Sequence, residues 1–226
     1  MGRQRTPPPR LVGAASTALA ARISARNRRR KLRLFLETVR PDSSTRVVDV
    51  GVTDTAFGSE PGVAGTHNFF EAMYPWPERI TAVSDRDLSR FQQAFPEVTC
   101  IVADGRDLPF AEDEFDVAFS NAVVEHVGDR RAQRDFVHEL CRVAPRVFAS
   151  TPNRWFPIES HTLVPLAHWL PRGPRERAFS ALRRSEWEGV ELLGPRDFVS
   201  LFPFSVRAHV VDVGMTTTVV AERARR

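Results

Sequence analysis

From Pro41 onward, short apolar runs alternate with segments whose apolar residues recur at helical spacing. Five runs have the length of buried strands, and they cover residues 46–51, 79–84, 98–102, 115–120 and 146–150. Helical patterns lie between several of these runs, at residues 69–74, 87–95 and 131–143. Buried strands that alternate with helices predict a parallel sheet that is covered on both faces.

Two further strand-like runs follow near the end of the chain, at residues 204–211 and 215–221. Only the three residues 212–214 separate them, and so short a connection permits an antiparallel hairpin and no crossover. We therefore expect an α/β fold with a doubly wound, mostly parallel sheet and a C-terminal antiparallel hairpin.

Residues 1–40 differ from the rest of the chain in charge. They carry 11 of the 32 Lys and Arg residues and one acid, Glu37, whereas residues 41–226 carry 21 bases and 27 acids. Four apolar residues recur at helical spacing before Pro41: Leu32, Phe35, Leu36 and Val39. We expect a basic N-terminal arm or helix over residues 1–40 that docks by its end on a domain formed by residues 41–226. A solvated basic helix is the simplest interpretation of the arm, and contact of residues 1–33 with anionic membrane or RNA is the alternative.

Composition sets the class of protein. The 226 residues are 42% hydrophobic and 27% charged, which is ordinary for a globular domain and excludes a fibrous or wholly disordered chain. No uncharged apolar run reaches the roughly 18 residues of a membrane span. Two cysteines, Cys100 and Cys141, cannot form a disulfide framework. We expect buried thiols in a cytoplasmic protein, with peripheral membrane contact as the alternative location.

Polar or glycine residues follow four consecutive predicted strands at the point where each strand ends. They are Asp49 and Gly51, then Ser84 and Asp85, then Asp104 and Gly105, and finally Asn121 and Ala122. An open parallel sheet binds its ligand beyond the carboxyl ends of its strands. One such polar group is usually a turn cap, but four in succession favour a polar ligand with several hydrogen-bond donors.

Two segments form a specific pattern together, residues 102–110 (VADGRDLPF) and residues 115–127 (FDVAFSNAVVEHV). With this pattern, residues 44–221 resemble class I S-adenosylmethionine-dependent methyltransferases of the small-molecule, type 11-like kind. Residues 151–162 further resemble a bacterial subgroup that has a long segment after the fifth strand. The resemblance implies a Rossmann-like sheet and S-adenosyl-L-methionine as the cofactor.

The resemblance also implies four contacts with this cofactor: its methionine end at Asp49 and Gly51, its ribose at Ser84 and Asp85, its adenine at Asp104 and Gly105, and the surroundings of its sulfonium at Asn121 and Ala122. Two departures from the family pattern stand out. Thr53 and Thr55 occupy the second and third glycine positions of its D-x-G-x-G-x-G motif. Ser84 stands where an acid usually ends the second strand, so ribose recognition moves to Asp85 or is weaker.

The segment from Thr151 to Pro171 follows the fifth strand, so it begins at the ligand edge of the sheet. Its Pro, Trp and His residues predict a stiff lid that excludes water. Glu159 and His161 are two residues apart and share one face of an extended chain, where they could act together as a general base. The alternative is that both only tie the lid to the domain, and His126 is then the next candidate base. His161 and His168 lack cysteines or clustered acids, so we expect no metal site.

The leading hypothesis is methyl transfer from S-adenosylmethionine to a small-molecule or a lipid- or glycan-linked acceptor. RNA methylation through the basic arm is a second hypothesis, but the fourth strand ends in Ser-Asn-Ala-Val and no RNA-binding fold is visible. A catalytically silent methyltransferase-like binding module is a third, supported by the degenerate first motif. A nicotinamide dehydrogenase is disfavoured, because no G-x-G-x-x-G follows the first strand.

Overall fold

The computed structural model describes residues 14–54, 68–157, 166–170, 173–174, 177, 190–211 and 214–223, and it gives the backbone alone for residues 14–24. Its strands are β1 Val47–Val50, β2 Ile80–Ser84, β3 Thr99–Val102, β4 Val117–Asn121, β5 Arg146–Pro152, β6 Arg207–Val211 and β7 Thr216–Glu222. Its α-helices are α1 Ala14–Val39, α2 Phe69–Met73, α3 Ser89–Ala94, α4 Arg130–Val143 and α6 Pro195–Val199. Three short 3₁₀ helices accompany them: η2 Pro77–Arg79, η3 Val124–His126 and η4 Ala167–Trp169.

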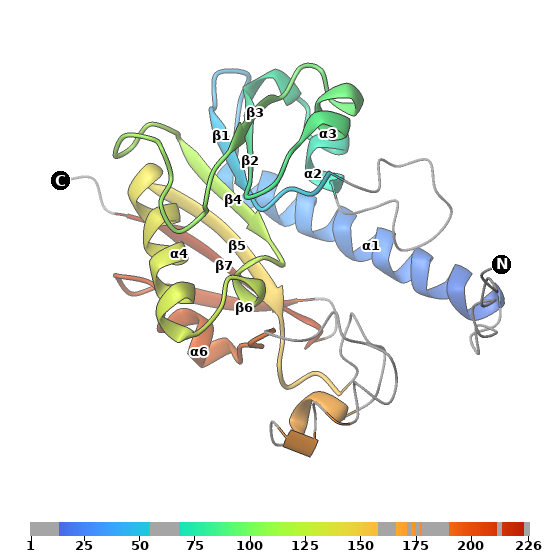
Figure 1. The fold of residues 1–226 in the computed structure, drawn as a ribbon. Helices are drawn as coiled ribbons and strands as arrows, with labels where there is room; N and C mark the ends of the chain where they lie inside the picture. The colour runs from blue at the N-terminus through green and yellow to red at the C-terminus, as the bar shows by residue number, and fades with distance from the viewer. Residues whose placement is uncertain are drawn as a thin grey trace, which may run out of the picture.

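The seven strands form one sheet in the order β3-β2-β1-β4-β5-β7-β6 (Figure 1). Strands β1 to β5 pair in parallel, and β7 pairs antiparallel with both β5 and β6. The predicted α/β fold with its antiparallel C-terminal hairpin is therefore confirmed. The sequence did not predict that β7 would lie between β5 and β6.

Helices cover both faces of the sheet, which is why its strands are apolar on both sides. Val48 and Val50 of β1 face the core under α4 and α6. Val47 faces the opposite core, which α1, α2 and α3 cover. Figure 1 shows α4 and α1 on opposite sides of the sheet.

Helix α1 belongs to the packed domain at its C-terminal end. Phe35 is fully buried, and its ring centroid lies 5.1 Å from that of Phe70, 5.7 Å from that of Phe119 and 5.4 Å from that of Phe148. Val39 is buried in the same core. The expected docking of this stretch is therefore present, and the amino-terminal half of α1 extends beyond the sheet (Figure 1).

The two cysteines are free thiols in different surroundings. Cys141 on α4 is buried, and burial raises the pKa of its thiol to about 12. Cys100 is only half-buried, contrary to the expectation of two buried thiols, because β3 is an edge strand with little cover. None of the helices in the described ranges combines the length and the apolar character that crossing a bilayer requires.

Candidate functional site

The carboxyl ends of β1 to β5 meet at one edge of the sheet. Ser84, the last residue of β2, pairs with Val102, the last residue of β3. Asn121, the last residue of β4, pairs with Ser150 of β5. The residues that follow these strands, which the sequence marked as candidates, therefore lie along a single edge.

Two positions on this edge accept only glycine. Gly51 has a φ of +105°, and a Cβ atom there would lie 2.2 Å from a methyl group of Val123. Its N–H donates to the carbonyl of Val83 over 2.8 Å, which fixes the turn after β1. A Cβ atom on Gly105 would lie 2.7 Å from the ring of Phe136. The backbone is thus packed tightly at the ends of both β1 and β3, and it presents peptide groups there in place of side chains.

Asp49 lies beneath this edge, in contact with a second acid. The side chains of Asp49 and of Glu71 on α2 are both buried and hydrogen-bonded to each other. Burial raises the pKa of both carboxyl groups, and the charge of Glu71 raises the pKa of Asp49 further. A hydrogen bond between two carboxyl groups needs a proton, so the pair holds one proton where two exposed acids would hold none.

Thr53, which replaces the second glycine of the family motif, is held by a buried asparagine. The Thr53 N–H donates to Asn68 Oδ1 over 3.3 Å, and Asn68 Nδ2 donates to the Thr53 carbonyl over 2.9 Å. Asn68 therefore closes the base of the segment between β1 and α2. Thr55 lies outside the described residues.

The predicted ribose and adenine contacts lie at the ends of β2 and β3. Ser84 is buried, and its Oγ accepts a hydrogen bond of 3.4 Å from the Arg86 N–H. Asp85 is exposed, and its carboxylate lies 3.8 Å from the Arg86 guanidinium. Asp104 is also exposed and accepts from Arg106 Nη2 over 2.6 Å and from Nε over 2.9 Å. These bonds lower the pKa of Asp104, so its carboxylate is charged and can accept further hydrogen bonds.

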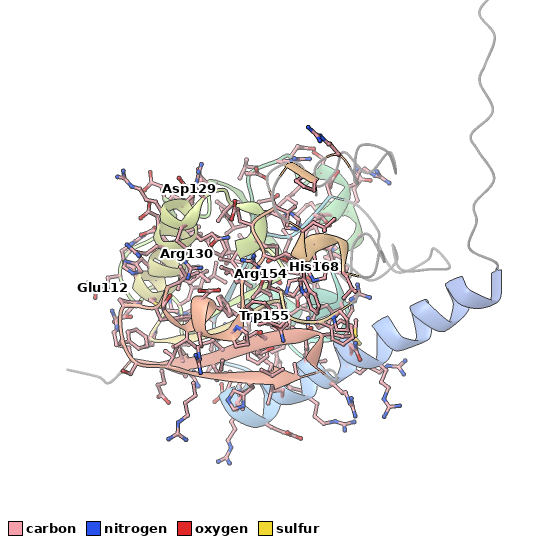
Figure 2. All side chains as sticks on the ribbon, turned by 90° about the horizontal axis from the view of Figure 1, so that it is seen from below. Glu112, Asp129, Arg130, Arg154, Trp155 and His168 are labelled. Carbon is pink, nitrogen blue, oxygen red and sulfur yellow. The ribbon has the colours of Figure 1, made fainter. Side chains whose placement is uncertain are left out.

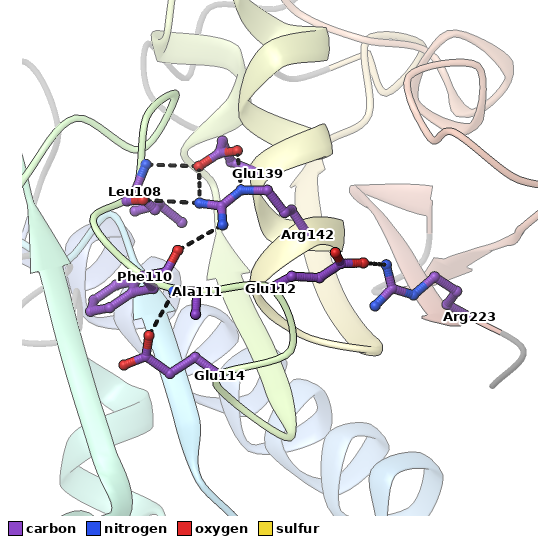
Figure 3. A network of polar contacts seen from close by, with 8 residues as sticks. All are labelled: Leu108, Phe110, Ala111, Glu112, Glu114, Glu139, Arg142 and Arg223. Carbon is purple, nitrogen blue, oxygen red and sulfur yellow. Dashed lines mark hydrogen bonds and ion pairs between the residues drawn. The ribbon is translucent and has the colours of Figure 1, made fainter. Parts of the chain in front are cut away.

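The backbone of the loop that carries Asp104 is hydrogen-bonded to an ion pair on α4 (Figure 3). Glu139 accepts from the Leu108 N–H over 2.8 Å and pairs with Arg142 over 2.6 Å. Arg142 in turn donates to the carbonyls of Leu108 and Phe110 over 2.9 and 2.7 Å. The Leu-Pro-Phe part of the sequence motif is therefore held by its backbone, which fixes the loop beside the site.

At the end of β4, Asn121 accepts two hydrogen bonds at one oxygen. Ser150 Oγ and Lys31 Nζ each donate to Asn121 Oδ1 over 2.8 Å. The next residue, Ala122, has a φ of +58°, and its N–H donates to the Ser150 carbonyl over 2.8 Å. A non-glycine residue in this region is strained by about 1–3 kcal/mol, and such strain concentrates at functional sites.

Of the three candidate bases, only His126 lies within the described residues. Its Nε2 atom lies 3.9 Å from Glu125 Oε1, and its side chain is partly exposed. Glu125 is fully buried, and its Oε2 accepts from Thr151 Oγ1 over 3.0 Å. Glu125 thus joins η3 to β5. Glu159 and His161 fall outside the described residues.

His168 belongs to the framework of the segment after β5. The Arg154 carbonyl accepts hydrogen bonds from His168 Nε2 over 3.0 Å and from Trp169 Nε1 over 2.7 Å. Figure 2 shows Arg154, Trp155 and His168 close together. Within the described residues, no group of three or more His, Cys, Asp or Glu side chains is placed to hold a metal ion.

Comparison with known families finds a match within the domain. Residues 63–146 match the family model described as a methyltransferase domain. The match runs from the segment before α2 to the start of β5. It therefore includes the Asp104 loop and leaves out Asp49 and Gly51, as well as Thr53 and Thr55, where the sequence departs from the family motif.

Solved structures of other methyltransferases share the fold at low sequence identity. The N-methyltransferase NodS from Bradyrhizobium japonicum, in complex with S-adenosyl-L-homocysteine, superposes with a TM-score of 0.55 at 11% identity and covers 91% of this chain and 99% of its own. An S-adenosylmethionine-dependent methyltransferase from Mesorhizobium loti superposes with a TM-score of 0.54 at 18% identity, and the superposition covers 85% of this chain and 98% of its own. Geranyl diphosphate C-methyltransferase from Streptomyces coelicolor superposes with a TM-score of 0.55 at 11% identity, and the superposition covers 95% of this chain and 86% of its own. A search of curated proteins finds no match.

Several residues of the candidate site were not predicted from the sequence. Lys31 is the lysine on the helix face that carries Phe35, so helical spacing could have pointed to it. Their spacing of three residues on one helix could also have indicated the ion pair between Glu139 and Arg142. The contact between Asp49 and Glu71 brings together two separate elements, and no local pattern indicates it.

Proposed function

We propose that this methyltransferase domain transfers a methyl group from S-adenosylmethionine to a small-molecule or a lipid- or glycan-linked acceptor. The observation that carries the proposal is the edge itself, where two obligatory glycines stand beside polar groups at the ends of β1 to β4. The cofactor is an adenosine joined to a charged amino acid. Glycine backbone at the strand ends, next to exposed carboxylates, fits such a molecule.

We assign residues of the edge to each part of the cofactor. Asp104 would accept from the adenine amino group and Asp85 from the ribose hydroxyls, since both carboxylates are exposed at the edge. Gly51 would hold the methionine end through its backbone. Asn121 and Ala122 would line the surroundings of the sulfonium, at the end of β4.

When bound, S-adenosylmethionine supplies a methyl group whose bond to sulfur breaks as a lone pair of the acceptor atom forms the new bond, and the old pair stays on sulfur. The donor is already activated, so the protein contributes mainly alignment, which can supply about 7–11 kcal/mol. A hydroxyl or protonated amine acceptor would need a base in addition. For that role we propose His161, oriented by Glu159, with His126 as the next candidate.

The acceptor class draws support from the surface of the chain. Arg26, Arg29 and Arg30 are exposed along α1, and Trp155 and Trp169 are exposed after β5. Exposed cations and Trp side chains are typical of proteins that contact an anionic membrane surface. This arrangement favours a lipid-linked acceptor over a freely soluble one.

Calorimetric titration with S-adenosyl-L-homocysteine tests the proposed function. Asp104→Ala should weaken binding by about 1.5–3 kcal/mol, the range for a hydrogen bond to a charged group. Asp107→Ala is the matched control, because Asp107 is an exposed acid of the same loop, and it should bind like the wild type. If the wild-type chain does not bind the ligand at millimolar concentration, the proposal is wrong and the domain is a silent binding module.

A further inference from the structure

One stripe of α1 changes from apolar to basic at the edge of the sheet. Arg28, Lys31, Phe35 and Val39 follow one another at spacings of three or four residues, so they share one helix face. Phe35 and Val39 are buried in the sheet core. Lys31 and Arg28 are half-buried, one and two turns before Phe35. The face that packs on the sheet therefore continues past it as a pair of cations.

Hydrogen bonds and a sulfur contact place this part of α1 against the β4–β5 end of the edge. Lys31 Nζ donates to Asn121 Oδ1, which also accepts from Ser150 Oγ. One helical turn earlier, Asn27 Nδ2 lies 3.8 Å from the sulfur of Met215, which immediately precedes β7. Helix α1 thus lies across the ends of β4 and β5 and the connection into β7.

Burial lowers the pKa of Arg28, but only to about 10, so this guanidinium is charged at neutral pH. Among the described residues, the acid Glu125 lies near the end of β5 and is fully buried, with its Oε2 accepting from Thr151. On the β2–β3 side of the edge, by contrast, the exposed charges are carboxylates next to arginines, Asp85 with Arg86 and Asp104 with Arg106. The β2–β3 side of the edge therefore carries ion pairs, and the β4–β5 end carries the cations of α1.

We infer that the β4–β5 end of the edge is an acceptor subsite for molecules that carry a carboxylate or phosphate group, and that Lys31 is its positioning residue. The inference rests on the proposed function, which puts the cofactor along β1 to β4 and leaves this end for the acceptor. An ammonium group here repels a protonated amine and attracts an anionic acceptor. The lysine also holds Asn121, so recognition of the acceptor's charge and the geometry at the end of β4 share one side chain.

The first test measures the charge of Lys31 with no acceptor present. S-adenosylmethionine carries a positive sulfonium, and S-adenosylhomocysteine carries a neutral thioether in its place. Lys31→Met should therefore improve the affinity for S-adenosylmethionine relative to S-adenosylhomocysteine by about three- to tenfold, as removal of one nearby like charge predicts. Lys31→Arg keeps the charge and should keep the ratio, and Arg30→Met, at an exposed position of the same helix, should leave it unchanged. A residue that only anchors α1 would weaken both ligands alike.

The second test uses simple anions as probes. The S-adenosylhomocysteine complex is titrated with inorganic phosphate, acetate and tetramethylammonium, and then mixed with vesicles that contain phosphatidic acid. We expect the wild type and Arg30→Met to bind phosphate or acetate and to reject tetramethylammonium. Lys31→Met should lose the anion at least tenfold. Vesicle binding that depends on Lys31 would assign the subsite to a lipid headgroup, and binding of free phosphate or acetate alone would assign it to a soluble acid.

The results separate the two proposals. An unchanged affinity ratio together with unchanged anion binding in Lys31→Met would overturn the subsite and leave the proposed function standing. Failure of the wild type to bind S-adenosylhomocysteine at all would overturn both.

Discussion

At the scale of single residues, the contact between Asp49 and Glu71 is a source of pH dependence. Both carboxyl groups are buried, and their pKa values are raised chiefly by burial. The folded chain therefore binds a proton that the unfolded chain has already lost above about pH 4.5. Stability is unaffected by this pair below that pH, and it falls as pH rises through the raised folded pKa.

Glu71→Gln should therefore stabilise the protein at alkaline pH. The amide can donate to Asp49 without a bound proton, so we expect the melting temperature to rise by about 2–4 °C at pH 8, or roughly 1 kcal/mol for a chain of this size. The difference should shrink toward pH 4. Glu78→Gln, an exposed position on η2, is the control and should change little at either pH. A lower melting temperature for Glu71→Gln at pH 8 would show that the charge of the Asp49–Glu71 pair does not destabilise the fold.

At the scale of elements, the attachment of the Asp104 loop to α4 has the opposite pH dependence. The hydrogen bonds from Arg142 lower the pKa of Glu139. A carboxylate whose pKa is lowered on folding contributes stability above its unfolded pKa of about 4.5. That contribution is lost as pH falls from there through the lower folded value.

Glu139→Gln should lower the free energy of unfolding by about 1 kcal/mol at pH 7, because a charge-assisted hydrogen bond becomes a neutral one. The cost should shrink as the pH falls through the lowered pKa of Glu139, because the wild-type carboxyl group then becomes protonated as well. Thermal unfolding from pH 3 to pH 8 measures both limits, with the exposed Glu97→Gln as control. Weaker binding of S-adenosylhomocysteine by Glu139→Gln at pH 7 would further show that the pair positions Asp104. A constant difference between variant and wild type across this pH range would contradict the assigned role.

The sequence predicted the elements better than their contacts. The strands were located to within three residues, because a parallel sheet covered on both faces needs uninterrupted apolar runs. The short helix Pro195–Val199 was not predicted, although the equally short α2 was. The sequence could place Gly51, Asp104 and Asn121 at one edge because topology alone carries them there. The bond from Lys31 to Asn121 joins residues 90 positions apart and depends on how α1 crosses the sheet.

At the scale of the whole molecule, charge is divided between two surfaces. Residues 1–40 carry 11 bases and one acid, and residues 41–226 carry more acids than bases. On α1, Arg26, Arg29, Arg30 and Arg33 are exposed, whereas Phe35 on the opposite side is buried in the domain. The arm can thus present positive charge to a membrane while its end remains part of the core.

Deleting residues 1–30 should leave a folded domain, because Phe35 and Val39 remain. Binding of S-adenosylhomocysteine should stay within about threefold of the wild type, since a neutral thioether gains little from distant charges. Sedimentation with phosphatidylglycerol vesicles should show binding by the full chain, a steep decrease with added salt, and none by the deletion variant. Vesicles of neutral lipid serve as the control. Equal sedimentation of both forms would show that residues 1–30 do not mediate binding to the membrane.

The position of β7 sets an order of events during folding. Strand β6 precedes β7 in the chain, yet β7 is the strand that connects it to the rest of the sheet. Until β7 pairs with both neighbours, the chain displays β6 and the open side of β5 as two unpaired edges, with Val210 exposed on one of them. The parallel strands β1 to β5 can assemble in the meantime, so chaperones would have to protect these two edges while the rest of the sheet is already folded.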